Sequence, residues 1–117
     1  MLDSDDAKRL SLRDDSLANE IKRGVVDPFV GSPALLAKTT TLRVGHLVNC
    51  NNFRHPAWLA KMATSLDVLS GGRLEFGIGS GSYEQEHLEA GIEWGSVRER
   101  SERLEEALEI VTRMFAS

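Results

Sequence analysis

The part of this chain with the clearest potential for chemistry is a glycine-rich run at the end of a predicted strand, Glu75-Phe76-Gly77-Ile78-Gly79-Ser80-Gly81. Bulky apolar residues alternate in it with Glu75, Gly77 and Gly79, and successive strand residues point to opposite faces of a sheet. Glycine inside a strand commonly marks the close approach of a ligand or of another backbone. The run therefore predicts a flat ligand on its bare face or, alternatively, relief of crowding inside a barrel.

Two nucleotide-type interpretations of this run conflict with the residues that follow it. The dinucleotide fingerprint G-x-G-x-x-G needs a third glycine where Ser82 stands. The run does match the acidic-x-Gly-x-Gly-x-Gly motif of S-adenosylmethionine-dependent methyltransferases. That fold also needs a following strand that ends in an acidic residue, and the corresponding position here falls in a predicted helix around Glu102. Both interpretations are therefore disfavoured.

The elements around the run predict a strand–helix–strand unit. Strands are expected at 42–48 and 73–78, and the apolar residues of 56–69 recur at helical spacing. A helical crossover of this kind is what two parallel strands require. Arg43 and Glu75 face the same side of these strands and are expected to pair.

Two more helices are expected towards the C-terminus. The first covers 83–90 and ends at Gly91, and the second opens with a capping box, Ser96-Val97-Arg98-Glu99. The charged run 98–106 is expected to be a solvated face. The apolar face of the second helix is expected to hold Val97, Leu104, Leu108, Val111 and Phe115.

The N-terminal part differs in character from the rest. Residues 1–26 predict a charged, weakly amphipathic helix or a solvated lead-in. Asp27-Pro28 resembles a helix start, but the residues 31–33 are expected to interrupt it. A short helix capped by Ser32 is therefore expected over 33–37.

Composition narrows the class of protein. A chain of 117 residues is one domain at most, and its net charge of −4 argues against binding to nucleic acid. A single cysteine, Cys50, excludes an internal disulfide and fits a reducing compartment. No apolar run approaches the length of a membrane span, which is about 18 residues or more, so a cytoplasmic location is expected. His87 has no second histidine at metal-ligand spacing, and no metal site is expected.

Several separate motifs, in one order along residues 27–115, closely resemble the bacterial luciferase-like monooxygenase family. The family includes enzymes that use FMN and enzymes that use the deazaflavin coenzyme F-420. The resemblance implies an α/β fold, a fragment of a (β/α)8 TIM barrel with about strands three and four and their helices. Residues 27–117 would then form a partial luciferase-like domain. The motifs include Leu42-Arg43-Val44-Gly45, Phe53-Arg54-His55-Pro56-Ala57, Ser70-Gly71-Gly72-Arg73-Leu74, Gly77-Ile78-Gly79-Ser80-Gly81, Glu86-His87 and 103–110.

The resemblance also implies where the cofactor lies. The isoalloxazine ring sits at the carboxyl ends of the barrel strands in this family, and a non-prolyl cis peptide often backs it, which corresponds here to the bond Leu47–Val48. His55 is a candidate for contact with substrate or cofactor, or else a capping residue, and the catalytic residue is not identified. The implied cofactor-binding residues are Leu47, Val48, Asn49, Gly79, Ser80, Gly81 and Tyr83.

Two functions follow as expectations. The first is a flavin- or deazaflavin-dependent oxidoreductase or monooxygenase that acts on a small organic substrate. Strands one and two of the family have no counterpart here, so the chain is expected to be a truncated piece without robust turnover alone. The second is a non-catalytic piece that binds another chain, or itself, through open sheet edges. His46 is expected to be packed, and no histidine partner for Cys50 can be assigned from spacing.

Overall fold

The computed structural model describes residues 27–117, which divide into two compact units. The described residues of the first unit are 27–46 and 66–75, and those of the second are 47–65 and 76–117. The helix expected within residues 1–26 lies outside the described part of the chain. The α/β class and the parallel pairing of the two predicted strand regions are confirmed.

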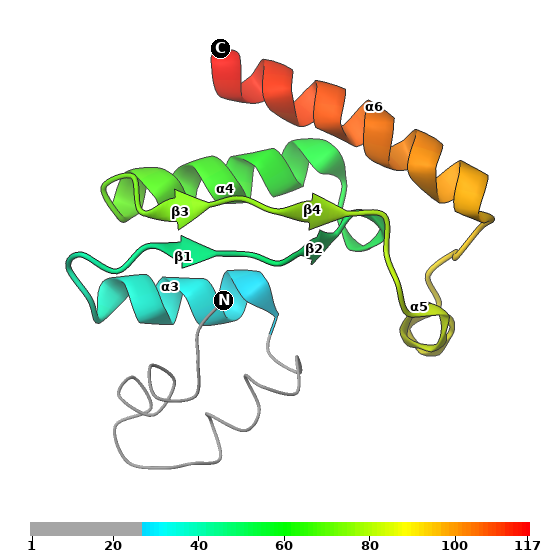
Figure 1. Ribbon diagram of the computed structural model, residues 1–117, viewed down its shortest axis with the longest axis horizontal. Helices are drawn as coiled ribbons and strands as arrows, with labels where there is room; N and C mark the ends of the chain where they lie inside the picture. The colour runs from blue at the N-terminus through cyan, green and yellow to red at the C-terminus, as the bar shows by residue number, and fades with distance from the viewer. Residues whose placement is uncertain (1–26) are drawn as a thin grey trace. The chain divides into compact units, whose positions relative to one another are not determined.

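The described residues of the first unit include one complete helix, which lies beside a short parallel ladder. Helix α3 (Pro28–Ala37) lies along strand β1 (Val44–Gly45), and β1 pairs in parallel with β3 (Leu74–Glu75), as Figure 1 shows. The predicted strands 42–48 and 73–78 are shorter than expected, since only Val44–Gly45 and Leu74–Glu75 pair within them, and a second parallel pair, Asn49–Cys50 with Ile78–Gly79, begins after the first predicted strand and at the end of the second. Pairing is interrupted around the peptide bond Leu47–Val48, which is cis, as the resemblance implied.

The prediction that residues 31–33 interrupt a helix begun at Pro28 was wrong. The helix starts at Pro28, with the Asp27 carboxylate accepting from the Phe29 amide at 2.8 Å, and it continues through Pro33. Proline in a helix removes one backbone hydrogen bond. Ser32 is buried and its hydroxyl donates to the Pro28 carbonyl, so it binds within the helix instead of capping a new one. Burial of this side of α3 outweighs the local interruption.

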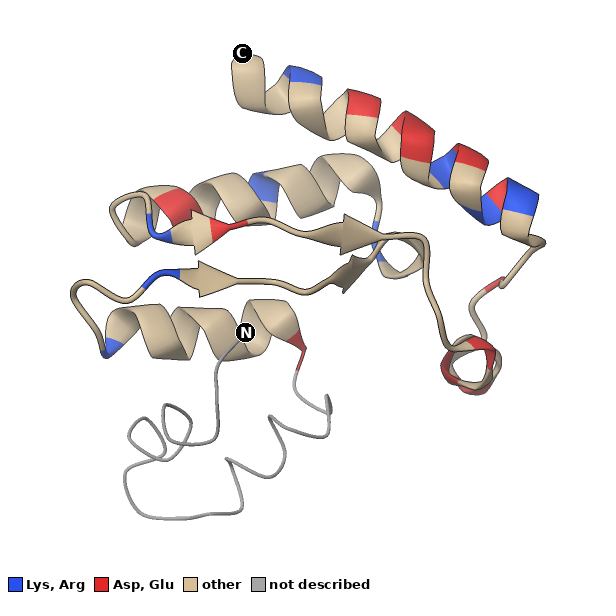
Figure 2. Ribbon diagram, viewed as in Figure 1, with Lys and Arg blue, Asp and Glu red and all other residues tan. Residues whose placement is uncertain are grey.

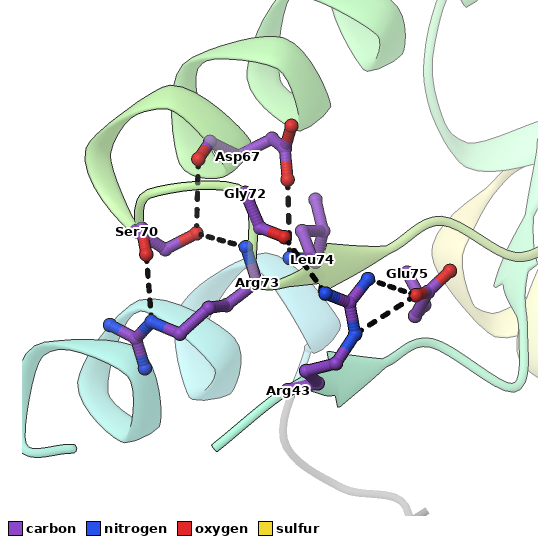
Figure 3. Close-up of polar contacts among 7 residues, drawn as sticks. All are labelled: Arg43, Asp67, Ser70, Gly72, Arg73, Leu74 and Glu75. Atoms are coloured by element: carbon purple, nitrogen blue, oxygen red, sulfur yellow. Dashed lines mark hydrogen bonds and ion pairs between the residues drawn. The ribbon is translucent and has the colours of Figure 1, made fainter. Parts of the chain in front are cut away.

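Polar side chains fix the turn that leads into β3 (Figure 3). The Asp67 carboxylate accepts from the Leu74 amide at 3.2 Å, and the Ser70 hydroxyl accepts from the Arg73 amide at 3.2 Å. The Arg73 guanidinium also donates to the carbonyls of Leu36 and Leu42 at 2.9 and 3.0 Å. This one side chain therefore joins the end of α3 to the residues just before β1.

Arg43 and Glu75 form the expected ion pair across β1 and β3. The Arg43 Nε donates to the Glu75 carboxylate at 3.1 Å, and its Nη1 donates to the Gly72 carbonyl at 3.2 Å. Both side chains are exposed. Exposed pairs contribute about 0–1 kcal/mol to stability, so this pair favours the strand register more than it stabilises the fold.

The second unit is built on another parallel pair. Strand β2 (Asn49–Cys50) pairs with β4 (Ile78–Gly79), and a 3-10 turn, η1 (Asn51–Phe53), follows β2 directly. Helix α4 (Pro56–Leu69) has the predicted bounds; its residues 56–65 belong to this unit, and among them Leu59, Ala60 and Ala63 are buried. Helices α5 (Glu84–Ala90) and α6 (Val97–Ala116) complete the unit, with α6 packed on η1.

The capping box at the start of α6 is confirmed. The Ser96 hydroxyl accepts from the Glu99 amide at 3.1 Å, and the Glu99 carboxylate accepts from the Ser96 amide at 2.6 Å. These bonds to Ser96 lower the pKa of Glu99. Figure 2 shows both acidic and basic residues along α6. No helix among residues 27–117 is both long and apolar enough to cross a membrane.

The predicted apolar face of α6 was only partly right. Val111 is buried, whereas Val97, Leu108 and Phe115 are exposed. The buried residues of this helix are Arg100, Ala107 and Val111. The buried face of α6 is therefore rotated about the helix axis from the predicted apolar face. The packed face thus includes a small residue, Ala107, and a charged one, Arg100, which lies over the Trp94 ring.

Candidate functional site

The residues that the resemblance assigns to the cofactor all lie in the second unit. Leu47 and Val48 directly precede β2 and Asn49 begins it, whereas Gly79 ends β4 and the loop 80–83 follows it. Leu47 is 79% exposed and Val48 is 49% exposed, so two apolar side chains are presented to solvent just before β2. Asn49 is only 1% exposed, and its side-chain amide donates to the Gly77 carbonyl at 2.9 Å. Asn49 therefore ties the two strands together instead of facing outwards.

The empty side of Gly79 is occupied by a neighbouring side chain. A Cβ added at Gly79 would lie 2.8 Å from Cγ2 of Val48. The interpretation that this glycine leaves room for a flat ligand is therefore wrong at this position, and relief of crowding is the reason that holds. Gly79 lets Val48 lie across the strand end, and a ligand at this edge would meet Val48 and not the glycine.

The loop after β4 needs glycine for two reasons. Gly81 has a φ of 94°, a conformation that L side chains rarely adopt. An added Cβ would also lie 3.2 Å from Sγ of Cys50 and 3.3 Å from the ring of Trp94. The inner side of the loop is thus packed, while Tyr83 at its far end is 63% exposed.

Beneath this loop lies a buried polar cluster centred on His87, which sequence reasoning missed. His87 is 1% exposed. Its Nδ1 lies 2.9 Å from the Tyr83 carbonyl, and its Nε2 lies 3.2 Å from the Asn52 amide nitrogen and 3.5 Å from Sγ of Cys50. Glu86-His87 is one of the motifs of the family resemblance, but spacing predicted no role for His87 beyond the absence of a metal site. The one local signal was the separation of four between Tyr83 and His87, which brings a helical side chain back to the preceding turn.

Cys50 thus has a histidine partner, which spacing along the sequence could not assign. Burial is the main reason why the pKa of its thiol is raised, which keeps the sulfur protonated. A reactive cysteine needs the opposite shift, because the thiolate is the nucleophile. The contact between Cys50 and His87 therefore serves packing and not nucleophilic chemistry.

Arg100 belongs to the same cluster and not to a solvated face as predicted. Its guanidinium carbon lies 3.6 Å from the centroid of the Trp94 ring, and Nη1 donates to the Gly95 carbonyl at 2.6 Å. A cation over an indole face is attracted by the negative charge of that face. Arg100 therefore holds Trp94 against His87, whose ring centroid is 4.7 Å away.

The other two histidines have simpler surroundings. His46 is buried, as expected, with its ring edge-on to Phe29 at 4.9 Å and beside the Ser32 hydroxyl. His55 is exposed, and its Nδ1 accepts from the Ala57 amide at 3.1 Å, so it caps the start of α4. Within residues 27–117, no three side chains of the metal-binding types gather as a metal site.

Comparison with known proteins identifies the family. The model of the luciferase-like monooxygenase family matches residues 14–117. The F420-dependent glucose-6-phosphate dehydrogenase of Amycolatopsis mediterranei is 33% identical over 86 residues, which cover 73% of this chain and 26% of that protein. A protein of the same name from Microbacterium testaceum is 36% identical over 90 residues, 76% of this chain and 26% of its own length.

A relative with a different cofactor also matches. The oxygenase component of a flavin-dependent trigonelline monooxygenase from Acinetobacter baylyi is 36% identical over 76 residues, which cover 63% of this chain and 21% of that protein. The chain spans about a quarter of the length of the first two relatives. The chain belongs to the luciferase-like monooxygenase family.

Proposed function

We propose that this chain supplies part of the ring-binding face of a flavin- or deazaflavin-dependent oxidoreductase or monooxygenase that acts on a small organic substrate. The observation that carries the proposal is the exposed apolar pair, Leu47 and Val48, of which Val48 lies against Gly79 at the carboxyl end of β4, where the glycine loop begins. Relatives in the family are F420-dependent or flavin-dependent by name. In a complete (β/α)8 barrel, with this chain as about strands three and four, this edge would be the active face.

The residues at this edge fit one face and one rim of a planar aromatic ring. Leu47 and Val48 offer apolar surface, which removes water from a ring laid on them. Ser80 and Gly81 offer backbone groups at the rim, and the exposed Tyr83 adds an aromatic side chain. The bound flavin or deazaflavin would supply the hydride or oxygen chemistry.

The buried residues of the site have supporting roles in this proposal. Asn49 holds β2 to β4 through the Gly77 carbonyl, which keeps the apolar pair in place. Gly79 gives Val48 its position across the strand end. His55 lies at the start of α4 and is a candidate for contact with substrate, since its Nε2 has no role in the cap. The same surface serves FMN and coenzyme F-420.

The test is a titration of the purified chain with FMN and, separately, with coenzyme F-420, read by the fluorescence of the ring. We expect saturable quenching or a spectral shift with one of them. Replacement of Leu47→Ser should weaken binding at least about tenfold, because burial of a leucine side chain is worth about 1.5–3 kcal/mol and every 1.4 kcal/mol is about tenfold in affinity. Val97→Ser is the matched control, since Val97 is similarly exposed, at 71%, but lies on α6.

A flat titration with both cofactors would refute the proposal, as would equal affinities of the wild type and Leu47→Ser. The alternative, a non-catalytic piece that associates through open strand edges, has its own signature in the same samples. A flat titration together with a mass that rises with concentration in sedimentation experiments would favour it.

A further inference from the structure

Both ends of the loop 80–83 are joined to one buried side chain, His87. At one end, the imidazole Nδ1 contacts the Tyr83 carbonyl at 2.9 Å. At the other end, the Asn52 amide nitrogen lies 3.2 Å from Nε2 of His87 and 3.4 Å from the Ser80 carbonyl. A chain of hydrogen bonds therefore runs from Ser80 through Asn52 and His87 to Tyr83, and it links the two ends of the loop.

The chemistry of the atoms sets the direction of each bond. A carbonyl oxygen can only accept, so Nδ1 of His87 carries the hydrogen that is donated to Tyr83. The opposite nitrogen, Nε2, is then an acceptor. The Asn52 amide nitrogen has two hydrogens, one for Nε2 of His87 and one for the Ser80 carbonyl. Every contact in the path is thus consistent with one neutral tautomer of His87.

Aromatic packing prevents the imidazole from turning away from these partners. The ring centroid of Phe53 lies 4.8 Å from that of His87, and the ring of Trp94 is edge-on at 4.7 Å. Contacts of this geometry are favourable between aromatic rings. The loop in turn rests on the same cluster at Gly81, whose added Cβ would meet Cys50 and Trp94.

The geometry points to His87 as a positioning residue that holds the loop 80–83 in the shape in which it borders the cofactor ring. That the loop borders the cofactor ring rests on the proposed function, whereas the inference that His87 keeps the loop ordered does not depend on it. His87 is buried, so it acts through Tyr83 and Asn52 and touches no ligand itself. Loss of its two hydrogen bonds should free the loop while the helices around it stay folded.

The experiment compares two readouts across matched variants of the full chain. The first is hydrogen–deuterium exchange of the peptide that covers 79–84, with peptides from α4 and α6 as internal references. The second is the ring fluorescence of added FMN and of coenzyme F-420. His87→Phe keeps the aromatic packing and removes both bonds. His87→Asn keeps a donor near the Nδ1 position. Glu89→Gln, an exposed change on the same helix, is the control.

We expect His87→Phe to raise exchange in 79–84 about tenfold, the factor that corresponds to one net hydrogen bond, and to weaken cofactor binding by a similar factor. His87→Asn should restore part of both values, and Glu89→Gln should change neither. Asn52→Ala removes the bonds to the Ser80 carbonyl and to Nε2 of His87 but leaves the bond between His87 and Tyr83, and it should loosen the same loop. If His87→Phe raises exchange throughout the second unit, the Asn52→Ala variant provides the second test.

Unchanged exchange of 79–84 in His87→Phe would overturn the inference. A rise spread equally over α4 and α6, with no effect of Asn52→Ala on the loop, would also overturn it. A freed loop with unchanged cofactor affinity would refute the role towards the ring. Absence of cofactor binding in the wild type, with a loop that is still freed in His87→Phe, would refute the proposed function and leave His87 as the residue that orders the loop.

Discussion

Replacement of Gly79→Ala tests the packing at the strand end most directly. The added Cβ would lie 2.8 Å from Cγ2 of Val48, whereas carbon atoms in contact prefer about 3.5–4.0 Å. Gly79 does not have a positive φ, so alanine meets no backbone strain there. The effect of the substitution is therefore a steric one between two side chains.

The loss of stability in Gly79→Ala depends on how far the Val48 side chain can move away from the added Cβ. Overpacking costs about 1–3 kcal/mol, and because Val48 is half-exposed, we expect the lower part of that range, about 1–2 kcal/mol. Val48→Ala alone should cost about 0.8 kcal/mol, half the transfer value of two methyl groups. In the double variant the clash disappears, since Cβ of Val48 lies 3.9 Å from the added Cβ.

A double-mutant cycle measured by urea unfolding, with far-ultraviolet circular dichroism, isolates this contact. The double variant should be more stable than Gly79→Ala alone, with a coupling energy of about 1–2 kcal/mol. Gly45→Ala is the matched control, because its added Cβ would lie 3.5 Å from Cβ of Glu75, an ordinary contact. A wild-type stability for Gly79→Ala, or a double variant no more stable than Gly79→Ala, would refute the reasoning.

Two more predictions concern the loop and the buried thiol. Gly81→Ala and Gly91→Ala both place alanine at a positive φ, but of these two glycines only Gly81 has neighbours within 4 Å. In urea titrations, Gly81→Ala should therefore lower the free energy of unfolding by about 1 kcal/mol more than Gly91→Ala does. Equal losses in the two variants would contradict this. Burial raises the pKa of Cys50, so iodoacetamide should alkylate it more slowly than a free thiol at about pH 8. The same shift makes stability fall as pH rises above the ordinary thiol pKa, because the unfolded chain ionises first; Cys50→Ala should remove that slope, and an unchanged slope would count against it.

Local signals in the sequence were sufficient for several elements. Pro56 and Gly71 bracket α4, whose bounds were predicted correctly. Ser96 and Glu99 form the expected capping box, because both of its bonds lie within three residues. The family resemblance also placed the cis peptide bond at Leu47–Val48. Each of these features depends on residues that are near one another in the chain or on a motif that can be read directly.

The contacts that shape the candidate site depended on the tertiary structure. His87 lies 37 positions from Cys50 and 35 from Asn52, so no local pattern predicts that they meet. Val48 fills the space at Gly79 only because β2 and β4 pair in this register. Arg100 lies in a charged run of the sequence, yet its guanidinium packs on the ring of Trp94. Helical and turn preferences are local free energies, whereas these contacts exist only once distant side chains are brought together and water is removed from between them.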